Sequence, residues 1–336
     1  GVGMHPWGKW GQSFVRYGVK AAQDALKDAG VRWQDIQLVA GGDTIRNGYP
    51  GFVAGATFAQ ALGWSGAKVS SSYGACATGA QAISVARAHI LAGLCDVALV
   101  IGADAAPKGF FAPTGGRRPE DPDWLRFHVQ GITNPTYFGL YARRRMDAYG
   151  ATAEDFAAVK VKNARHGLHN PNARYRKEVG IEDVLGSAVV ADPLHLLDCS
   201  LVSDGGAAVI VTSAERARDF PHQPVYLLGF GEGHSHEHIS QAADLTTSAA
   251  RVSGERAYAM AGVGPDDIDF AQLYDWILGD RRRTRTRWAI CGALVTLSFI
   301  LISFLLSVSA VAQAPGQDTE VTGEASVVVI DDFVQG

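Results

Sequence analysis

The sequence contains few cysteines, and no two of them lie close together. Four occur among 336 residues, at positions 76, 95, 199 and 291, without a C-x-x-C pair. Zinc sites and disulfide frameworks require closely spaced or numerous cysteines, so the sequence indicates neither. The pattern instead fits reduced thiols in a cytosolic protein.

The sequence also lacks an excess of positive charge. Lys and Arg number 30 against 34 Asp and Glu, which gives a formal net charge of -4. Nucleic-acid-binding domains usually carry a basic field, so we exclude nucleic acid as the main partner. Hydrophobic residues make up 47% of the chain, enough to bury a large core in about two domains. No initiator methionine or signal segment precedes Gly1, and we expect a first strand upstream of it.

Helical and strand-like segments alternate from residue 11 to about residue 275. Short apolar runs bounded by glycine follow helical stretches, which is typical of an α/β layer fold. Residues 96–102 form a continuous apolar run rich in β-branched residues and predict a buried strand. The other predicted strands are residues 36–39, 67–71, 207–212 and 225–230, and the predicted helices are residues 15–29, 54–62, 78–91, 137–149 and 153–166.

Residues 105–135 interrupt this alternation. They are rich in Pro, Gly, Arg and Trp and predict the start of an inserted loop region, about residues 105–170, within an N-terminal domain of residues 1–224. Long insertions of this kind usually carry binding function.

An internal repeat organises the chain. Residues 29–39 and 261–271 share the pattern A-G-V-x-x-x-D-I-x, and each follows a helix and leads into an apolar strand. The repeat predicts two copies of one unit, with the second copy beginning near Val225. The chain does not supply enough residues of this character to complete the second copy, so we expect an incomplete second half.

The composition changes abruptly after residue 275. Residues 280–287 (D-R-R-R-T-R-T-R) are basic, and residues 288–308 form an uncharged apolar stretch of about twenty residues, long enough to span a bilayer. Residues 310–312 (A-V-A) then match the small-residue pattern of a signal-peptidase site. We therefore separate the start of a C-terminal domain, residues 225–278, from a basic and apolar segment, residues 279–312, and a tail, residues 313–336.

Three interpretations of this apolar segment remain open. It is a C-terminal membrane anchor, a buried core helix, or the start of an unrelated exported protein joined by a frameshift or gene fusion. The arginines at its edge disfavour a buried helix. If the segment is inserted, the arginines place residues 1–280 on the cytoplasmic side, with the strand-like residues 325–330 across the membrane.

Cys76 lies among small residues where a predicted strand gives way to a predicted helix. Residues 70–81 read S-S-S-Y-G-A-C-A-T-G-A-Q, which leaves room for a substrate to approach the sulfur. A helix that begins here directs its positive end at the thiol and lowers its pKa. Buried cysteines also serve as small core hydrophobes, so both a nucleophile and a packing role remain open.

Three motifs in order resemble the thiolase superfamily. They are residues 73–82 (Y-G-A-C-A-T-G-A-Q-A), residues 163–173 with N-A-R-H and N-P-N-A, and residues 203–208 (S-D-G-G-A-A). Residues 4–10 (M-H-P-W-G-K-W) and 48–52 (G-Y-P-G-F) resemble the sterol-carrier-protein-X type and the actinobacterial lipid-transfer proteins. The resemblance covers residues 1–275, and it implies an α/β fold: a layered α-β-α-β-α sandwich of two similar halves, the second incomplete.

The resemblance also implies roles for individual residues. Cys76 matches the acyl-accepting cysteine, which attacks a thioester carbonyl as thiolate. Ser200 resembles a serine that contacts the pantetheine of coenzyme A, although an ordinary structural hydroxyl explains it equally. Tyr274 and Asp275 lie where related steroid side-chain aldolases have Y-D-x-F, in which the tyrosine does acid–base work. The motif here continues Trp276-Ile277 and so departs from the family.

Two further catalytic groups of the family have no counterpart. No histidine follows His238, and Cys291 lies in the apolar segment. Three functions therefore remain open: acyl transfer through a Cys76 thioester, retro-aldol cleavage of a steroid side-chain thioester by Tyr274, and a non-catalytic lipid-transfer-type remnant. Coenzyme A thioester is expected as substrate, acyl-CoA or steroid-CoA, with no bound cofactor. The family also implies a homodimer and a small OB-fold, zinc-ribbon partner.

Other clusters allow both a functional and a structural interpretation. His234, His236 and His238 alternate and suggest a metal site on one face of a strand or a polar loop. His166, with His169, and Tyr137 are expected to shape the acyl pocket, or to hold the Asn-Pro turn in the case of the histidines. Arginines 117–118 and 143–145 are candidates for coenzyme A phosphates, or lie on solvated faces.

Overall fold

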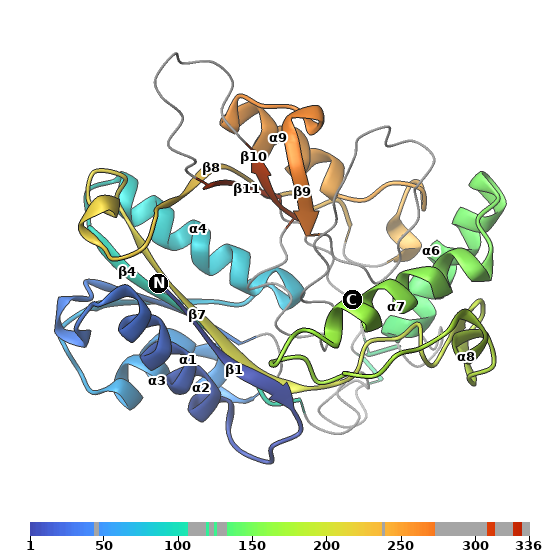
Figure 1. Ribbon diagram of the computed structural model, residues 1–336, viewed down its shortest axis with the longest axis horizontal. Helices are drawn as coiled ribbons and strands as arrows, with labels where there is room; N and C mark the ends of the chain where they lie inside the picture. Colours follow the sequence, from blue (N-terminus) through green and yellow to red (C-terminus); the bar gives the residue numbers. More distant parts are fainter. Residues whose placement is uncertain are drawn as a thin grey trace.

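Five layers of helices and sheets follow one another through the molecule. The computed structural model describes residues 1–43, 47–106, 119–120, 124–125, 133–236, 239–272, 308–312 and 325–330. From top to bottom, Figure 1 shows helix α9 (Ala250–Ala261), a small sheet, helix α4 (Thr78–Leu91), a larger sheet, and the helices α1 (Phe14–Ala29) and α3 (Ala54–Leu62). The predicted α/β layered sandwich is therefore confirmed.

The larger sheet joins its strands in the order β1-β7-β4-β2-β3. Strand β2 pairs in parallel with β3 and β4, while β7 pairs antiparallel with both β1 and β4. Every residue of β4 is buried, as its continuous apolar run predicted. The strands are β1 (Val2–Gly8), β2 (Leu38–Gly42), β3 (Lys68–Ser72), β4 (Val97–Asp104) and β7 (Asp204–Thr212).

Helices cover both faces of this sheet. On one side α1 buries Phe14, Tyr17 and four alanines at helical spacing, and it ends where Gly30 adopts a left-handed φ of 65°. Beside it, α3 packs against β2 and β3, preceded by the short α2 (Tyr49–Phe52). Helix α4 covers the other side. Its alanines at 82 and 86 join Leu38 and Val100 in one core cluster.

A large region leaves the sheet after β4 and returns at β7. Its described elements are α6 (Asn134–Tyr149), α7 (Ala153–Gly167), α8 (Ile181–Leu185) and the hairpin β5 (Val189–Ala191) with β6 (Leu194–His195). They lie on the right of Figure 1. Thr152 caps α7 in a capping box with Asp155.

Strand β1 differs from the sequence prediction. The first strand of the sheet was expected upstream of the chain, but residues 2–8 form it and pair with β7. Pro6 and the glycines obscured this strand in the sequence. Proline is tolerated because β1 is an edge strand, and its register shifts between His5 and Gly8.

The smaller sheet has the order β8-β11-β10-β9 and confirms the internal repeat. Both copies of the repeat run from a helix through a left-handed glycine and a single 3-10 turn into a strand, with φ of 65° at Gly30 and 70° at Gly262. The 3-10 turns are η1 (Trp33–Asp35) and η5 (Pro265–Asp267), and the strands of the smaller sheet are β8 (Val225–Gly231), β9 (Ile268–Gln272), β10 (Val308–Ala312) and β11 (Ala325–Ile330).

The C-terminal tail contributes to the smaller sheet. The predicted strand at residues 325–330 is confirmed as β11, which pairs in parallel with β8. The placement of this segment across a membrane, expected only if residues 288–308 are inserted, does not describe this structure, in which β11 and β8 belong to one sheet. The apolar residues 288–307 lie outside the described part. Nowhere in the part of the chain that the structure describes does a helix combine the length and hydropathy needed to cross a bilayer.

Candidate active site

The ends of the strands of the larger sheet gather chemically active side chains at one edge. Strands β1, β2, β3 and β4 end at this edge, and the antiparallel β7 begins there. Lys9 follows β1, Asp43 follows β2, and Cys76 follows β3, while Asp104 ends β4 and Asp204 begins β7. In open α/β sheets, ligands bind outside the carboxyl ends of the parallel strands, so this edge is the candidate site.

Cys76 lies in the sharp turn that joins β3 to α4. It is half-buried in the 3-10 turn η2 (Ala75–Ala77), and α4 begins two residues later at Thr78. The Thr78 hydroxyl accepts a hydrogen bond from the Gly74 N–H (3.0 Å) and donates one to the Ala75 carbonyl (2.7 Å). These two bonds fix the turn around the thiol.

The backbone before Cys76 is strained. Ala75 has a φ of 47° in the left-handed region, and it is the only residue other than glycine with a positive φ in the described chain. Such strain at a turn commonly marks a functional site. A Cβ at Gly74 would lie 2.4 Å from Gln81 Oε1, so a larger residue there would displace the end of the Gln81 side chain. The turn places Cys76 directly before the N-terminal end of α4.

Ser200 and His166 lie in adjoining segments. His166 is in the last turn of α7, and Ser200 lies shortly before β7. Leu197 packs against the core cluster to which Ala164 of α7 belongs, which brings the two segments together. Among the described residues, Ser200 Oγ and His166 Nδ1 are buried atoms without a hydrogen-bond partner. Native structures satisfy almost all such atoms, and a ligand or ordered water is the usual reason for an exception.

Tyr137 is buried, and its hydroxyl lies close to His236. The Tyr137 Oη and Tyr141 Oη atoms lie 3.4 and 3.3 Å from His236 Nε2, and Ser235 Oγ lies 2.9 Å from its Nδ1. This contact joins α6 to the loop after β8. His238 lies outside the described residues, and the residues that the structure describes contain no group of three or more His, Cys, Asp or Glu able to hold a metal ion.

The predicted pair Tyr274 and Asp275 lies outside the described residues, as do arginines 117–118. Of arginines 143–145, Arg143 forms an ion pair with Asp192, and the Arg145 guanidinium lies 5.2 Å from the ring centre of Tyr149. Cys199 lies next to Ser200, and burial raises its pKa to about 11, with a further rise from Asp198 and an opposing effect of Lys160. Cys199 is therefore a poor nucleophile beside Cys76.

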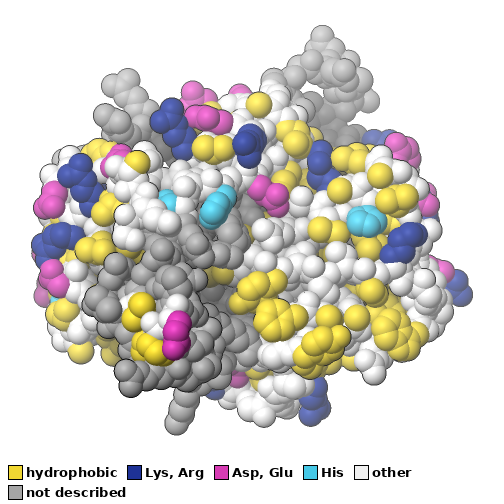
Figure 2. Space-filling view, turned by 180° about the vertical axis from the view of Figure 1, so that it is seen from behind, with side chains coloured by type: hydrophobic (Ala, Val, Ile, Leu, Met, Phe, Trp, Pro, Cys, Tyr) yellow, Lys and Arg dark blue, Asp and Glu magenta, His cyan; other side chains and the backbone are white. Residues whose placement is uncertain are grey.

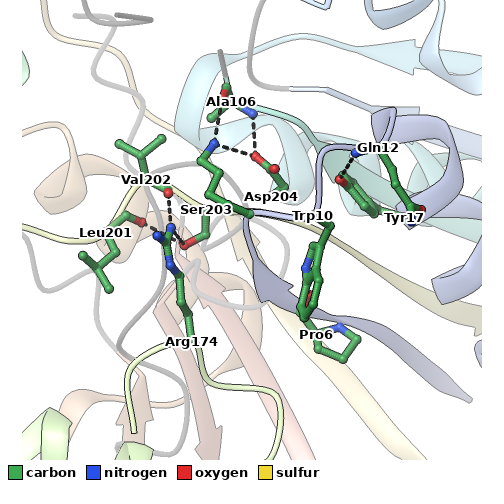
Figure 3. A network of polar contacts seen from close by, with 11 residues as sticks. Pro6, Trp10, Gln12, Tyr17, Ala106, Arg174, Leu201, Val202, Ser203 and Asp204 are labelled. Atoms are coloured by element: carbon green, nitrogen blue, oxygen red, sulfur yellow. Dashed lines mark hydrogen bonds and ion pairs between the residues drawn. The ribbon is translucent and has the colours of Figure 1, made fainter. Parts of the chain in front are cut away.

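A network of charged groups joins three strands at the site edge (Figure 3). The Lys9 ammonium lies 2.7 Å from Asp204 Oδ1 and donates a hydrogen bond of 2.7 Å to the Ala106 carbonyl. The Ala106 N–H donates to the same carboxylate oxygen at 3.0 Å. Strand β7 lies between β1 and β4. The buried Asp204 carboxylate at its start therefore binds both Lys9, which follows β1, and Ala106, which follows β4.

Arg174 holds the segment just before Asp204 (Figure 3). Its guanidinium donates to the Val202 carbonyl and to Ser203 Oγ, the latter at 3.0 Å. Sequence analysis singled out the S-D-G motif but neither Arg174 nor the role of Lys9. Their partners lie far away in sequence, and no local pattern marks them.

Comparisons with known proteins agree with this geometry. The thiolase N-terminal domain profile matches residues 11–215, and the thiolase C-terminal domain-like profile matches residues 231–277. An acetyl-CoA acetyltransferase from Methanothermobacter thermautotrophicus is 30% identical over 287 residues, which cover 82% of this chain and 72% of that protein. The chain belongs to the thiolase family.

Two further relatives are described as aldolases. A steroid side-chain-cleaving aldolase from Thermomonospora curvata is 36% identical over 180 residues, 52% of this chain and 42% of the relative. A solved structure described as an Ltp2-ChsH2(DUF35) aldolase aligns with a TM-score of 0.69 and 27% identity, covering 90% of this chain and 75% of that one. The resemblance inferred from the motifs is thus confirmed at the level of the family.

Proposed function

We propose that the chain is an acyl-CoA enzyme of lipid or sterol metabolism that forms a thioester on Cys76. One observation carries the proposal: Cys76 is held in a strained turn between β3 and α4, at the carboxyl edge of the sheet. The Cys76 thiolate attacks the carbonyl carbon of a coenzyme A thioester. The carbon–sulfur bond to coenzyme A breaks, coenzyme A leaves as its thiol after taking a proton, and the acyl group then passes to an acceptor.

Ser200 and His166 are proposed to bind the substrate. Their buried atoms without partners support a ligand with hydrogen-bonding groups, such as the amides of pantetheine. The proposal needs no bound cofactor, since the coenzyme A thioester is itself the substrate. Tyr137 is proposed to shape the acyl pocket from α6, with its hydroxyl held by His236.

Intact mass spectrometry after incubation with an acyl-CoA tests the proposal. We expect an acyl adduct on the wild-type chain and on Cys199→Ala, and none on Cys76→Ala. Cys199→Ala is a matched control because it removes another half-buried thiol, one whose pKa is raised to about 11. An adduct that persists in Cys76→Ala, or its absence from the wild type, would contradict acyl transfer through Cys76.

A second candidate function is retro-aldol cleavage of a steroid side-chain thioester, with Tyr274 as acid–base residue beside Asp275. The similarity to a steroid side-chain-cleaving aldolase favours it. Cleavage that survives in Cys76→Ala and is lost in Tyr274→Phe would select this function. A chain that binds a steroid thioester without either reaction would instead be a lipid-transfer-type remnant.

We also propose that the chain forms a homodimer through β3. This strand is at the open edge of the larger sheet, and the side chains around it are apolar and exposed. They are Tyr49 (76% exposed), Phe52 (58%), Trp64 (64%), Val69 (43%) and Tyr73 (43%). Figure 2 shows hydrophobic side chains gathered on the lower part of the face opposite to Figure 1. An edge strand with such neighbours favours pairing with a second copy.

A small OB-fold, zinc-ribbon protein is a further proposed partner. The solved relative is described as an aldolase containing two named proteins, Ltp2 and ChsH2(DUF35), which supports a second component. Co-purification of the tagged chain with such a protein, compared between wild type and a β3-edge variant, would distinguish this partner from the homodimer.

A further inference from the structure

Residues 200–203 depend on side chains for their position. They belong to neither a helix nor a strand, and they link the hairpin β5–β6 to the first residue of β7. At the β7 end, Asp204 is fixed to the sheet by Lys9 and Ala106. The segment before it receives its main contacts from Arg174, which lies in the loop after α7.

Arg174 contacts two consecutive residues of this segment. It donates to the Val202 carbonyl and, at 3.0 Å, to Ser203 Oγ. Ser203 is fully buried, and its hydroxyl donates a hydrogen bond of 3.2 Å to the Leu201 carbonyl. The three residues that follow Ser200 are therefore linked, directly or through Ser203, to one guanidinium.

The loop that carries Arg174 is itself attached to the sheet. The Trp7 N–H of β1 donates to the Asn172 carbonyl at 3.1 Å, and Ala173 is buried. Trp7 is 4% exposed and belongs to the core cluster on the α4 side of the sheet. Arg174 thus extends from a loop that is hydrogen-bonded to β1. Its hydrogen bonds therefore fix residues 201–203 relative to β1.

We propose that Arg174 is a positioning residue for the coenzyme A thioester. By fixing the residues that follow Ser200, it holds Ser200 in the position from which it meets the substrate. This inference rests on the proposed function, in which Ser200 Oγ receives a hydrogen bond from or donates one to the bound substrate. Ser200 Oγ is buried and without a partner among the described residues, so its position determines how well a substrate group meets it. Arginine suits the role because its planar fork supplies two donors at once, whereas lysine supplies a single point charge.

Single-turnover acylation of Cys76, measured against acyl-CoA concentration, tests the inference. In Arg174→Leu we expect the half-saturating concentration to rise about tenfold while the rate at saturation stays within about twofold, because binding and not chemistry is impaired. Arg174→Lys should restore part of the loss. Arg32→Leu is a matched control, since Arg32 is exposed and pairs only locally with Asp35.

The outcomes separate this inference from the proposed function. A lower melting temperature in Arg174→Leu with unchanged half-saturation would overturn the positioning role and leave acyl transfer intact. If the wild type forms no adduct, acyl transfer fails, and calorimetric binding of coenzyme A decides the inference: a tenfold weaker Kd in Arg174→Leu supports it, and an equal Kd overturns it. Absence of coenzyme A binding to the wild type would overturn both.

Discussion

At the scale of single residues, the buried charge of Asp204 stabilises the edge of the sheet where the candidate site lies. The Asp204 side chain is 7% exposed. Its carboxylate forms an ion pair with Lys9 and accepts a hydrogen bond from the Ala106 N–H. Removing one partner of a buried ion pair leaves the other charge without compensation, which costs more than the pair itself contributes. Lys9 is 40% exposed, so water screens part of this effect.

Replacing Lys9 by methionine should therefore destabilise the fold. We expect Lys9→Met to lower the free energy of unfolding by about 2 kcal/mol, measured by urea denaturation. Lys20→Met is the control, because Lys20 pairs with Asp24 on an exposed helix face and should change stability by less than about 0.5 kcal/mol. Equal effects of the two substitutions would argue against a buried role for the Asp204 carboxylate.

Cys199 should be labelled by alkylating reagents far more slowly than an exposed cysteine. Burial raises its pKa from an ordinary value of 9.0 to about 11, so little thiolate exists at pH 8. Labelling of Cys199 by iodoacetamide in the folded chain should rise about tenfold per pH unit and level off near pH 11. The folded chain holds this proton more tightly than the unfolded one, so the free energy of unfolding should also fall as the pH rises from about 9 to 11.

Peptide mapping by mass spectrometry measures the labelling at each pH. The urea-unfolded chain provides the reference, in which Cys199 titrates near its ordinary value. Labelling at pH 8 that is equally fast in the folded and unfolded chain would show that the thiol is not buried.

Local sequence revealed some of these residues and concealed others. Cys76 and Asp204 stand in short motifs whose composition reflects their chemistry, so both could be found without a structure. Arg174 acts on residues 28 and 29 positions away, and Lys9 on Asp204 at a separation of 195. Contacts of this range depend on the strand order β1-β7-β4, which no local pattern encodes.

At the scale of elements, α3 lies unusually close to the sheet. A Cβ at Gly41 of β2 would lie 2.4 Å from the Gly55 nitrogen, and one at Gly55 would lie 2.0 Å from the Ser70 carbonyl oxygen of β3. Real Cβ atoms do not approach backbone so closely, so the helix and both strands touch through backbone. This contact sets the position of β3 and hence of the turn that holds Cys76.

Substituting Gly55 should disturb both stability and the thiol. We expect Gly55→Ala to lower the free energy of unfolding by about 3 kcal/mol, because the helix must move away from β3. Acylation of Cys76 should slow at the same time. Gly180→Ala is the control, since a Cβ there would lie 3.5 Å from Asp183 Oδ2 in ordinary contact. Calorimetric melting of both variants measures the difference, and similar melting points would contradict the close packing.

Helices were predicted from the sequence with better bounds than strands. The predicted helices at residues 54–62 and 78–91 match α3 and α4, because their ends carry clear glycine and small-residue signals. The predicted strand at residues 36–39 is displaced to Leu38–Gly42, since the 3-10 turn η1 precedes it and glycines continue it. Strand β1 could not be predicted, because its partner β7 supplies the pairing that its composition does not suggest.

At the scale of the whole molecule, the proposed homodimer depends on the open edge at β3. Phe52 and Tyr73 lie with ring centres 5.6 Å apart, so the apolar side chains around this edge adjoin one another. Burial of such a surface in a dimer supplies a hydrophobic contribution that a monomer lacks.

A charge placed on this edge should separate the copies. We expect wild-type chains to sediment as a dimer and Val69→Lys chains as a monomer, because lysine on an edge strand opposes edge-to-edge pairing. Val2→Lys is the control, as Val2 is 61% exposed on β1, which forms the opposite edge of the same sheet. Analytical ultracentrifugation at several concentrations measures both, and an unchanged dimer in Val69→Lys would rule out this edge as the interface.

Strands β4 and β7 pair antiparallel, as the two strands of a β-hairpin do. The connection between them, however, is a whole region of the protein. Asp104 lies opposite Gly205 in the register, so residues 105–203 leave and return at adjacent points of the sheet. Changes of length within this region therefore need not alter the pairing on either side. Elements of this region can therefore be replaced in the laboratory while β3, the strand that precedes Cys76, stays unchanged.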